Sequence, residues 1–97
     1  MVDLCEDMRK FGRGIGNTSR YRIIEALFAG SQTVGEIVKK TKLSQPLVSQ
    51  HLRVLKETEL VEDERQGQEV YYKLNAEHTV RLLKRLSESL QSKKRRT

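Results

Sequence analysis

Apolar residues recur at helical spacing from the start of the chain. A first helix is predicted from Asp3 to about Arg13, because four apolar residues follow one another at steps of four and three. They are Leu4, Met8, Phe11 and Ile15. Glycines at positions 12, 14 and 16 are expected to end this helix.

A second helix is predicted to begin at Asn17-Thr18 and to run to about Ala29. The Asn17 side chain suits an N-cap, and Gly30 suits a helix stop. The apolar spacing assigns four residues to the inner face, namely Ile23, Ile24, Leu27 and Phe28.

Two more helices are predicted to follow in quick succession. The first runs from Val34 to near Thr41. Ser44 is expected to cap the second, from Gln45 to about Glu57, because Ser at an N-cap and Pro in the first turn both favour a helix start.

The remaining signals predict a hairpin and a last helix. Strand-like runs from Leu60 to Glu64 and from Glu69 to Leu74 flank a turn at Gln66-Gly67. A final helix opens at Asn75 to Glu77, and it carries a broad apolar stripe. The predicted fold is mainly α with a small β-hairpin, in the order α-α-α-α-β-β-α. That order is typical of a winged helix-turn-helix with an extra helix at each end.

The chain has 97 residues, which favours a single domain over residues 1–92 and a basic disordered tail at 93–97. The formal net charge is +6, but four positive charges lie in that tail. Without them, the chain has 15 basic and 13 acidic residues, so its body is only mildly basic. The case for nucleic-acid binding therefore depends on where individual charges lie.

Cysteine and hydropathy patterns predict a cytoplasmic protein. Cys5 is the only cysteine, which excludes an intrachain disulfide scaffold, and burial as a small apolar side chain is the favoured role for it. An intersubunit contact between two copies of Cys5 stays open. The charged N-terminus is not expected to act as a signal peptide, and no run approaches the roughly 20 apolar residues of a membrane span.

The helices from Val34 to Glu57 have the spacing of a helix-turn-helix. In such a pair the second helix enters the major groove of DNA. Val48, Leu52 and Leu55 fall on its inner face. The opposite face contains no acid and offers Gln for adenine, Arg for guanine and Ser for bases or phosphate. Its candidate DNA-binding residues are Ser44, Gln45, Ser49, Gln50, Arg53 and Lys56.

Two further DNA contacts are predicted. The hairpin tip presents Arg65, Gln66 and Gln68 for a phosphate or the minor groove, although an ordinary charged turn is the alternative. Arg20 and Arg22 are candidates for phosphate clamps, with surface charge or pairing to Glu25 as equal alternatives.

The stretch from Leu43 to Leu74 resembles the ArsR/SmtB family of small bacterial and archaeal repressors. The family's recognition helix carries a Ser-x-x-x-Val-Ser-x-His-Leu-x-x-Leu pattern, which this chain matches from Ser44 to Leu55. The wing pattern of a Gly, then Tyr-Tyr and Leu, is matched by Gly67, Tyr71-Tyr72 and Leu74.

The resemblance implies a homodimer, built from the first and last helices, that binds double-stranded DNA at an inverted repeat. The apolar stripes of those helices agree, because they have little core to fill within one small body, although capping the monomer core is the alternative. The candidate interface residues are Leu4, Met8, Phe11, Leu83, Leu86 and Leu90.

No metal or other cofactor is expected. Where members of the family carry a Cys-x-Cys metal site, this chain has Thr33 and Gly35. At the family's other site, Ala76 and Ser89 replace two ligands and only His78 matches. One histidine cannot supply the roughly four ligands of zinc, and His51 is expected to be a packed residue of the recognition helix.

An enzyme is not expected, because the chain has no Gly-rich phosphate loop and only two His residues. The predicted function is a sequence-specific transcriptional regulator, and repression is the expected mode of action. The alternatives are a winged-helix module for protein partners and an architectural protein that binds DNA without sequence preference.

Overall fold

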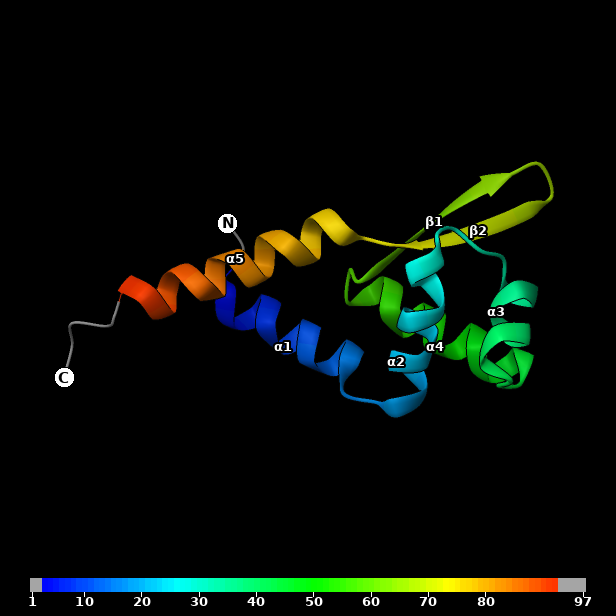
Figure 1. Ribbon diagram of the computed structural model, residues 1–97, viewed down its shortest axis with the longest axis horizontal. Helices are drawn as coiled ribbons and strands as arrows, with labels where there is room; N and C mark the ends of the chain where they lie inside the picture. The colour runs from blue at the N-terminus through cyan, green and yellow to red at the C-terminus, as the bar shows by residue number, and fades with distance from the viewer. Residues whose placement is uncertain (1–2, 93–97) are drawn as a thin grey trace.

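The computed structural model describes residues 3–92, and its elements follow the predicted order (Figure 1). The predicted fold class is confirmed. The predicted basic tail at 93–97 lies outside the described residues. The helices are α1 (Leu4–Ile15), α2 (Thr18–Ala26), the short 3₁₀ turn η1 (Leu27–Ala29), α3 (Val34–Thr41), α4 (Gln45–Glu57) and α5 (Ala76–Ser92), and the strands are β1 (Val61–Gln66) and β2 (Glu69–Leu74).

Polar side chains fix where the central helices begin. Asn17 Oδ1 accepts the amide hydrogen bond of Arg20 at 3.0 Å, and Ser44 Oγ accepts that of Leu47 at 3.3 Å. Each contact satisfies one of the amides that a helix start leaves without a partner. Because Ser44 sets the first residue of α4, it also sets which side chains of that helix face outward.

The strands form an antiparallel hairpin in which Gln66 pairs with Glu69. The two turn residues are therefore Gly67 and Gln68, one position later than predicted. Gly67 has a φ of 65°, which a glycine adopts without strain and which a two-residue hairpin needs at its first turn position. β1 also begins one residue later than predicted and continues to Gln66.

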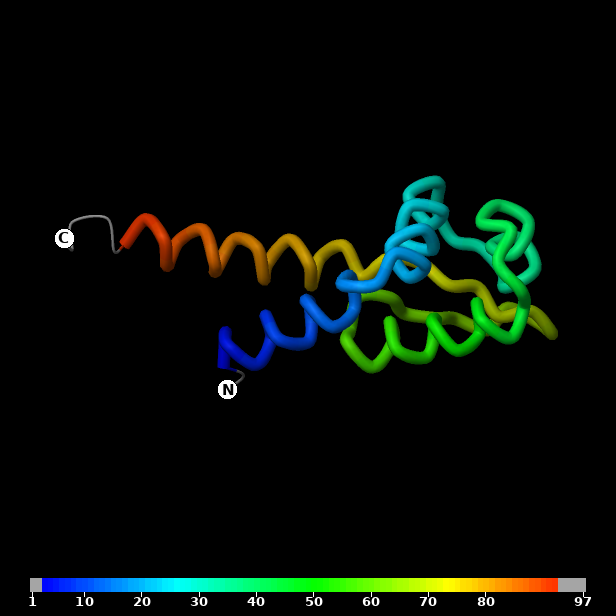
Figure 2. The backbone as a smooth tube through the Cα atoms, turned by 90° about the horizontal axis from the view of Figure 1, so that it is seen from below, coloured from blue at the N-terminus to red at the C-terminus, as the bar shows by residue number. Residues whose placement is uncertain are grey.

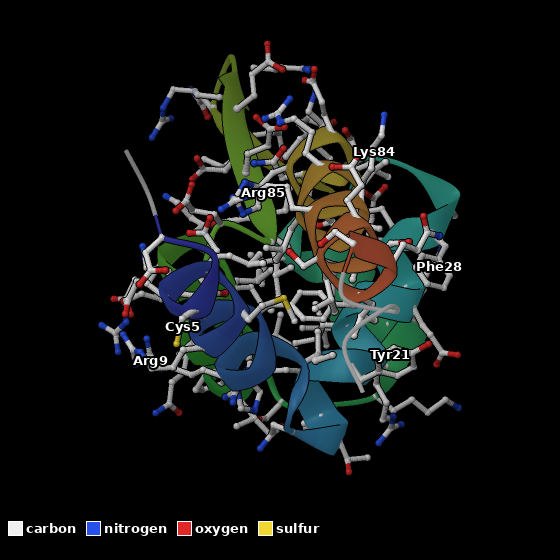
Figure 3. The ribbon with its side chains drawn as sticks, turned by 90° about the vertical axis from the view of Figure 1, so that its left-hand side faces the viewer. Cys5, Arg9, Tyr21, Phe28, Lys84 and Arg85 are labelled. Atoms are coloured by element: carbon white, nitrogen blue, oxygen red, sulfur yellow. The ribbon has the colours of Figure 1, made fainter. Side chains whose placement is uncertain are left out.

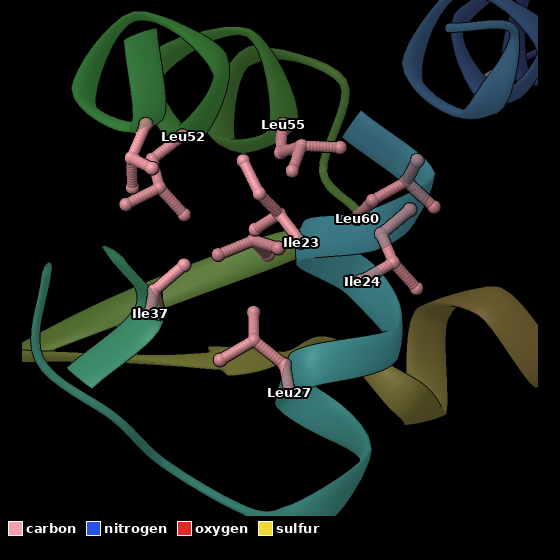
Figure 4. Packing of buried hydrophobic residues seen from close by; sticks show 9 residues of the cluster. Ile23, Ile24, Leu27, Ile37, Leu52, Leu55 and Leu60 are labelled. Atoms are coloured by element: carbon pink, nitrogen blue, oxygen red, sulfur yellow. The ribbon is translucent and has the colours of Figure 1, made fainter. Parts of the chain in front are cut away.

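The core lies where α2, α3 and α4 meet the start of the hairpin. Ile23 and Ile37 are fully buried, and Leu52 and Leu55 of α4 point toward them (Figure 4). The prediction that Phe28 lies inward is wrong, because its side chain is 64% exposed. Phe28 belongs to η1, and a 3₁₀ turn rotates more per residue than an α-helix, which turns Phe28 away from the stripe of α2.

α1 and α5 run antiparallel and project together from this core, with the end of α5 reaching past the start of α1 (Figures 1 and 2). The radius of gyration is 15.4 Å, whereas a compact domain of this length has about 12.5 Å. Arg85 of α5 donates to Asp7 of α1 at 2.8 Å, and Asp7 is buried. The projecting pair is thus held together but leaves one side without cover from its own chain.

Cys5 is exposed on α1, so the expectation of a buried thiol is wrong (Figure 3). It lies in the first turn of the helix, where its amide donates to the side chain of the N-cap residue Asp3 at 3.1 Å. Among the described helices, none combines the length and the apolar character that a membrane span needs.

Candidate nucleic-acid interface

The outer face of α4 is exposed and free of acidic groups from its cap to Lys56. Val48, Leu52 and Leu55 are buried on the inner face. Opposite them, the structure brings six predicted residues onto one exposed surface, namely Ser44, Gln45, Ser49, Gln50, Arg53 and Lys56. We call these six residues the α4 face. Amide, hydroxyl and guanidinium groups are therefore presented together on one rigid helix.

Two members of the α4 face have partners within the protein. Ser44 Oγ accepts the cap hydrogen bond, which leaves its own hydroxyl hydrogen available for a phosphate oxygen. Lys56 donates to Asp63 of β1 at 2.8 Å, and this hydrogen bond raises the pKa of the Lys56 ammonium. Lys56 stays charged, but the Asp63 carboxylate offsets its positive charge, so Arg53 is the stronger positive group of the face.

The hairpin projects beyond α3 and α4 (Figure 1), and Arg65, Gln66 and Gln68 are exposed near its tip. Arg65 pairs across the hairpin with Val70. The acids Glu62, Asp63 and Glu64 are also exposed on β1. Arg65 therefore carries positive charge near the tip of this wing, whereas the rest of β1 is acidic and faces one exposed cation, Lys73, across from Glu62 on β2.

Arg20 and Arg22 lie elsewhere than the α4 face. Arg20 Nε donates to the Gly14 carbonyl at 2.9 Å, and Arg20 Nη2 donates to the Arg13 carbonyl at 2.7 Å. Arg22 Nη2 donates to the carbonyl of Thr41, the last residue of α3, at 2.7 Å. Neither pairs with Glu25 in the described hydrogen bonds, and both guanidinium groups hold helix ends in place.

His51 is buried on α4, and Arg20 Nη1 lies 3.5 Å from its Nδ1. Burial, and after it the positive charge of Arg20, lower the pKa of the imidazole below its ordinary value of 6.5. The fold therefore favours neutral His51. Since Nδ1 faces a donor, the ring hydrogen belongs on Nε2. The expectation of a packed histidine agrees with this geometry.

Neutral His51 predicts a stability loss in mild acid. Below about pH 6.5 the unfolded chain takes up a proton that the folded chain resists, so stability falls with pH, by at most about 1.4 kcal/mol per pH unit. Thermal unfolding of the parent and of His51→Gln at pH 7.5 and 5.5 measures the effect. We expect a larger loss in the parent. Because His51→Gln changes no other titratable group, equal losses would contradict the role of His51.

Within residues 3–92, no three His, Cys, Asp or Glu side chains converge in a way that suits a metal ion. His78 lies in the first turn of α5, where its amide donates to the Asn75 side chain at 3.4 Å. Its imidazole has therefore not been brought to a ligand cluster in the described part of the chain.

Comparison with known proteins places this geometry in a family. A family model described as "Bacterial regulatory protein, arsR family" matches residues 17–63, which run from the cap of α2 into β1. The chain is 37% identical over 68 residues to the transcriptional repressor SdpR of Bacillus subtilis, a match that covers 70% of this chain and 76% of that protein. It is 31% identical over 90 residues to a transcriptional repressor SmtB homolog of Synechocystis, covering 93% and 68%.

Solved structures agree with these matches. A winged helix-turn-helix DNA-binding domain from Mycobacterium bovis, described as homodimeric, is 28% identical with a TM-score of 0.74, covering 93% of this chain and 82% of that one. The family resemblance noted from the recognition-helix and wing motifs is confirmed. On the identities and coverage of these relatives, the chain belongs to the ArsR family of bacterial regulatory proteins.

Proposed function

We propose that this chain is a homodimeric transcriptional repressor that reads an inverted-repeat operator with α4 and contacts the flanking DNA with its wing. The observation that carries the proposal is the α4 face, an exposed and acid-free surface on the second helix of a helix-turn-helix. SdpR and the SmtB homolog are named repressors, which supports repression over activation. Such a regulator acts where the chromosome is, so we place it in the cytoplasm, and no part of the proposal requires catalysis.

Each side chain of the α4 face has a role that fits its chemistry. Gln45 and Gln50 suit adenine, Arg53 suits guanine, and Ser49 is small enough to let the helix backbone approach the groove. Ser44 and Lys56 lie at opposite ends of the helix, where phosphate contacts fix its position. The wing adds Arg65, with Gln66 and Gln68 beside it, as a contact outside the major groove.

The dimer is proposed to form on the side of α5 that its own chain leaves open. The large apolar residues that are exposed in residues 3–92 all lie on α2, η1 and α5, and they are Tyr21 (45% exposed), Phe28 (64%), Val80 (63%), Leu83 (44%) and Leu90 (66%). Figure 3 shows Tyr21 and Phe28 beside α5, on the side away from Cys5 and Arg9. An exposed cluster of this kind marks an interaction surface.

The predicted interface residues divide into two groups. Leu83 and Leu90 belong to the open side, whereas Leu4, Met8, Phe11 and Leu86 are half-buried. Phe11 also lines an apolar hollow of about 270 Å³, together with Tyr21, Phe28 and Val80. A partner's apolar side chains would fill this hollow, so we add Tyr21, Phe28 and Val80 to the proposed interface. Residues 1–92 then act as one domain for both DNA binding and dimerisation.

Selection of bound duplexes from a random pool tests the function. We expect one inverted-repeat motif to be enriched, with an affinity at least about 10³-fold above that for a scrambled duplex at the same salt concentration. Equal affinity for both duplexes would favour an architectural DNA-binding protein. No binding to any duplex would favour a module for protein partners.

Two variants are expected to separate base reading from backbone contact. Gln50→Ala should reduce the binding free energy for the selected duplex by about 1–3 kcal/mol, because it removes a bidentate contact to a base. It should also weaken the sequence preference at that one base position. Arg65→Ala should weaken selected and scrambled duplexes alike and reduce the salt dependence of binding. Fluorescence anisotropy titrations at three salt concentrations measure both, with Arg9→Ala on α1 as the control. Parental binding by both variants would contradict the proposed roles of helix and wing.

A further inference from the structure

We infer that Arg20 is a positioning residue that links the recognition helix α4 to α1, the helix that the Arg85–Asp7 pair joins to α5, and so fixes the spacing of the half-sites that the dimer accepts. This inference rests on the proposed function. The guanidinium of Arg20 contacts two helices at once. It donates to the carbonyls of Arg13 and Gly14 at the end of α1, and it lies against the imidazole of His51 in the middle of α4.

The α1 side of this link is the stronger one. The last turn of a helix leaves its carbonyls without partners inside the helix, and a cation there is favoured by the helix dipole. Arg20 satisfies two such carbonyls, at 2.9 and 2.7 Å. Its planar fork donates to the two carbonyls from Nε and Nη2 while Nη1 faces His51, a spread of donors that the one nitrogen of a lysine does not reproduce.

The α4 side depends on neutral His51. An imidazole with a free lone pair on Nδ1 accepts from Arg20, whereas a charged imidazole would repel it. His51 is flanked in sequence by Gln50 of the α4 face and by buried Leu52. Arg20 therefore touches the recognition helix from behind, at the level of its base-reading residues.

The other links from α1 reach the end of α4 or the residues after it, and they include the close approach of Gly14 to buried Thr58 and Leu60. Arg13 pairs with Glu57, and Lys10 pairs with Glu59, each at 3.4 Å and each exposed. Exposed pairs of this kind hold geometry weakly. Arg20 is half-buried and reaches the middle of α4, so it is the link that transmits the position of α1 to the DNA-reading residues.

The consequence for DNA binding follows from the twofold symmetry. A dimer reads two half-sites about one helical turn apart only if both recognition helices are held at a fixed angle to the dimer helices. With Arg20 in place, insertion of one base pair between the half-sites is expected to weaken binding strongly. Loosening the link should let each recognition helix adjust separately and so reduce that penalty.

Arg20→Lys tests this role because it keeps the positive charge. The probes are the duplex selected by the parent protein and the same duplex with one base pair inserted at its centre. For the parent we expect the insertion to raise Kd by about 100-fold or more, and for Arg20→Lys by about tenfold or less. Arg9→Lys, whose side chain pairs only with Glu6 on its own helix in the described contacts, is the matched control and should keep the parental ratio.

A phosphate contact by Arg20 gives a different pattern. Lysine would then preserve both the affinity and the spacing penalty, and Arg20→Gln would lower the slope of log K against log salt by about 0.9 for each phosphate that is no longer neutralised. A positioning role leaves the slope of Arg20→Gln at the parental value. A parental spacing penalty in Arg20→Lys, or a reduced slope in Arg20→Gln, would overturn the inference.

A measurement without DNA keeps the test independent of the operator. Spin labels at Ser49→Cys, in a Cys5→Ser background, report the distance between the two recognition helices of a dimer. We expect a narrow distance distribution with Arg20 and a broader one with Arg20→Lys. Equal widths in the two proteins would overturn the inference, whereas absence of operator binding by the parent would count against the proposed function alone.

Discussion

Leu83→Glu is expected to give a folded monomer whose affinity for the selected duplex is at least about 100-fold weaker than that of the parent, because the avidity of two linked recognition helices disappears. Leu83 is 44% exposed in one chain, so a carboxylate there stays in water and disturbs the fold little. In a dimer that buries the open side of α5, the same carboxylate is desolvated without a partner. That cost opposes association directly.

Sedimentation equilibrium and DNA titration together measure this effect. Arg81→Glu is the control, since Arg81 lies on the opposite, polar face of α5, where it pairs with Glu77. We expect the control to stay dimeric at micromolar concentration, although its charge changes by two. A dimeric Leu83→Glu protein would show that the interface lies elsewhere. A circular dichroism spectrum like that of the parent excludes unfolding as the cause of a lower mass.

The sequence predicted the DNA-reading helix well because its signals are local. Ser44 caps α4, and the helical period then separates buried Val48, Leu52 and Leu55 from the α4 face. The start of the helix and the direction in which each side chain faces are therefore both determined by neighbouring residues. The predicted turn of the wing was one residue too early. Gly67 is acceptable as the first or as the second turn residue, and only the strand register shows that it is the first.

What the sequence did not reveal depends on contacts between distant segments. Phe28 and Val80 are far apart in the chain, yet they line the same hollow. For Arg20 the sequence left a phosphate clamp, a surface charge and a pair with Glu25 open, because residue types alone do not show that the carbonyls of Arg13 and Gly14 lie within reach of its side chain.

Gly14→Ala is expected to destabilise the protein by about 1–3 kcal/mol, which is the usual cost of forcing a carbon into a packed site. A Cβ at position 14 would overlap the Leu60 side chain and lie 2.8 Å from Thr58 Oγ1. Both neighbours are buried, and the Thr58 hydroxyl also donates to the Leu55 carbonyl at 3.2 Å. The end of α1 therefore approaches the corner between α4 and β1 more closely than any side chain permits.

Gly12→Ala supplies the matched control on the same helix. A Cβ at position 12 meets nothing within 4 Å, so alanine should stabilise the helix by roughly 0.5–1 kcal/mol. Thermal unfolding of both variants is expected to show Tm changes of opposite sign, with Gly14→Ala lower by several degrees. Equal Tm changes in the two variants would contradict the close approach at Gly14.

A double-mutant cycle identifies the clash itself. Leu60→Ala removes the nearest obstructing carbon, so Gly14→Ala should cost less in that background than in the parent, with a coupling of at least about 0.5 kcal/mol. The Gly14 carbonyl also accepts from Arg20. If α1 shifts to make room for the new carbon, the link to His51 is disturbed as well, and the spacing penalty on DNA should fall together with stability. Loss of stability with an unchanged spacing penalty would mean that Leu60 gives way and α1 stays in place.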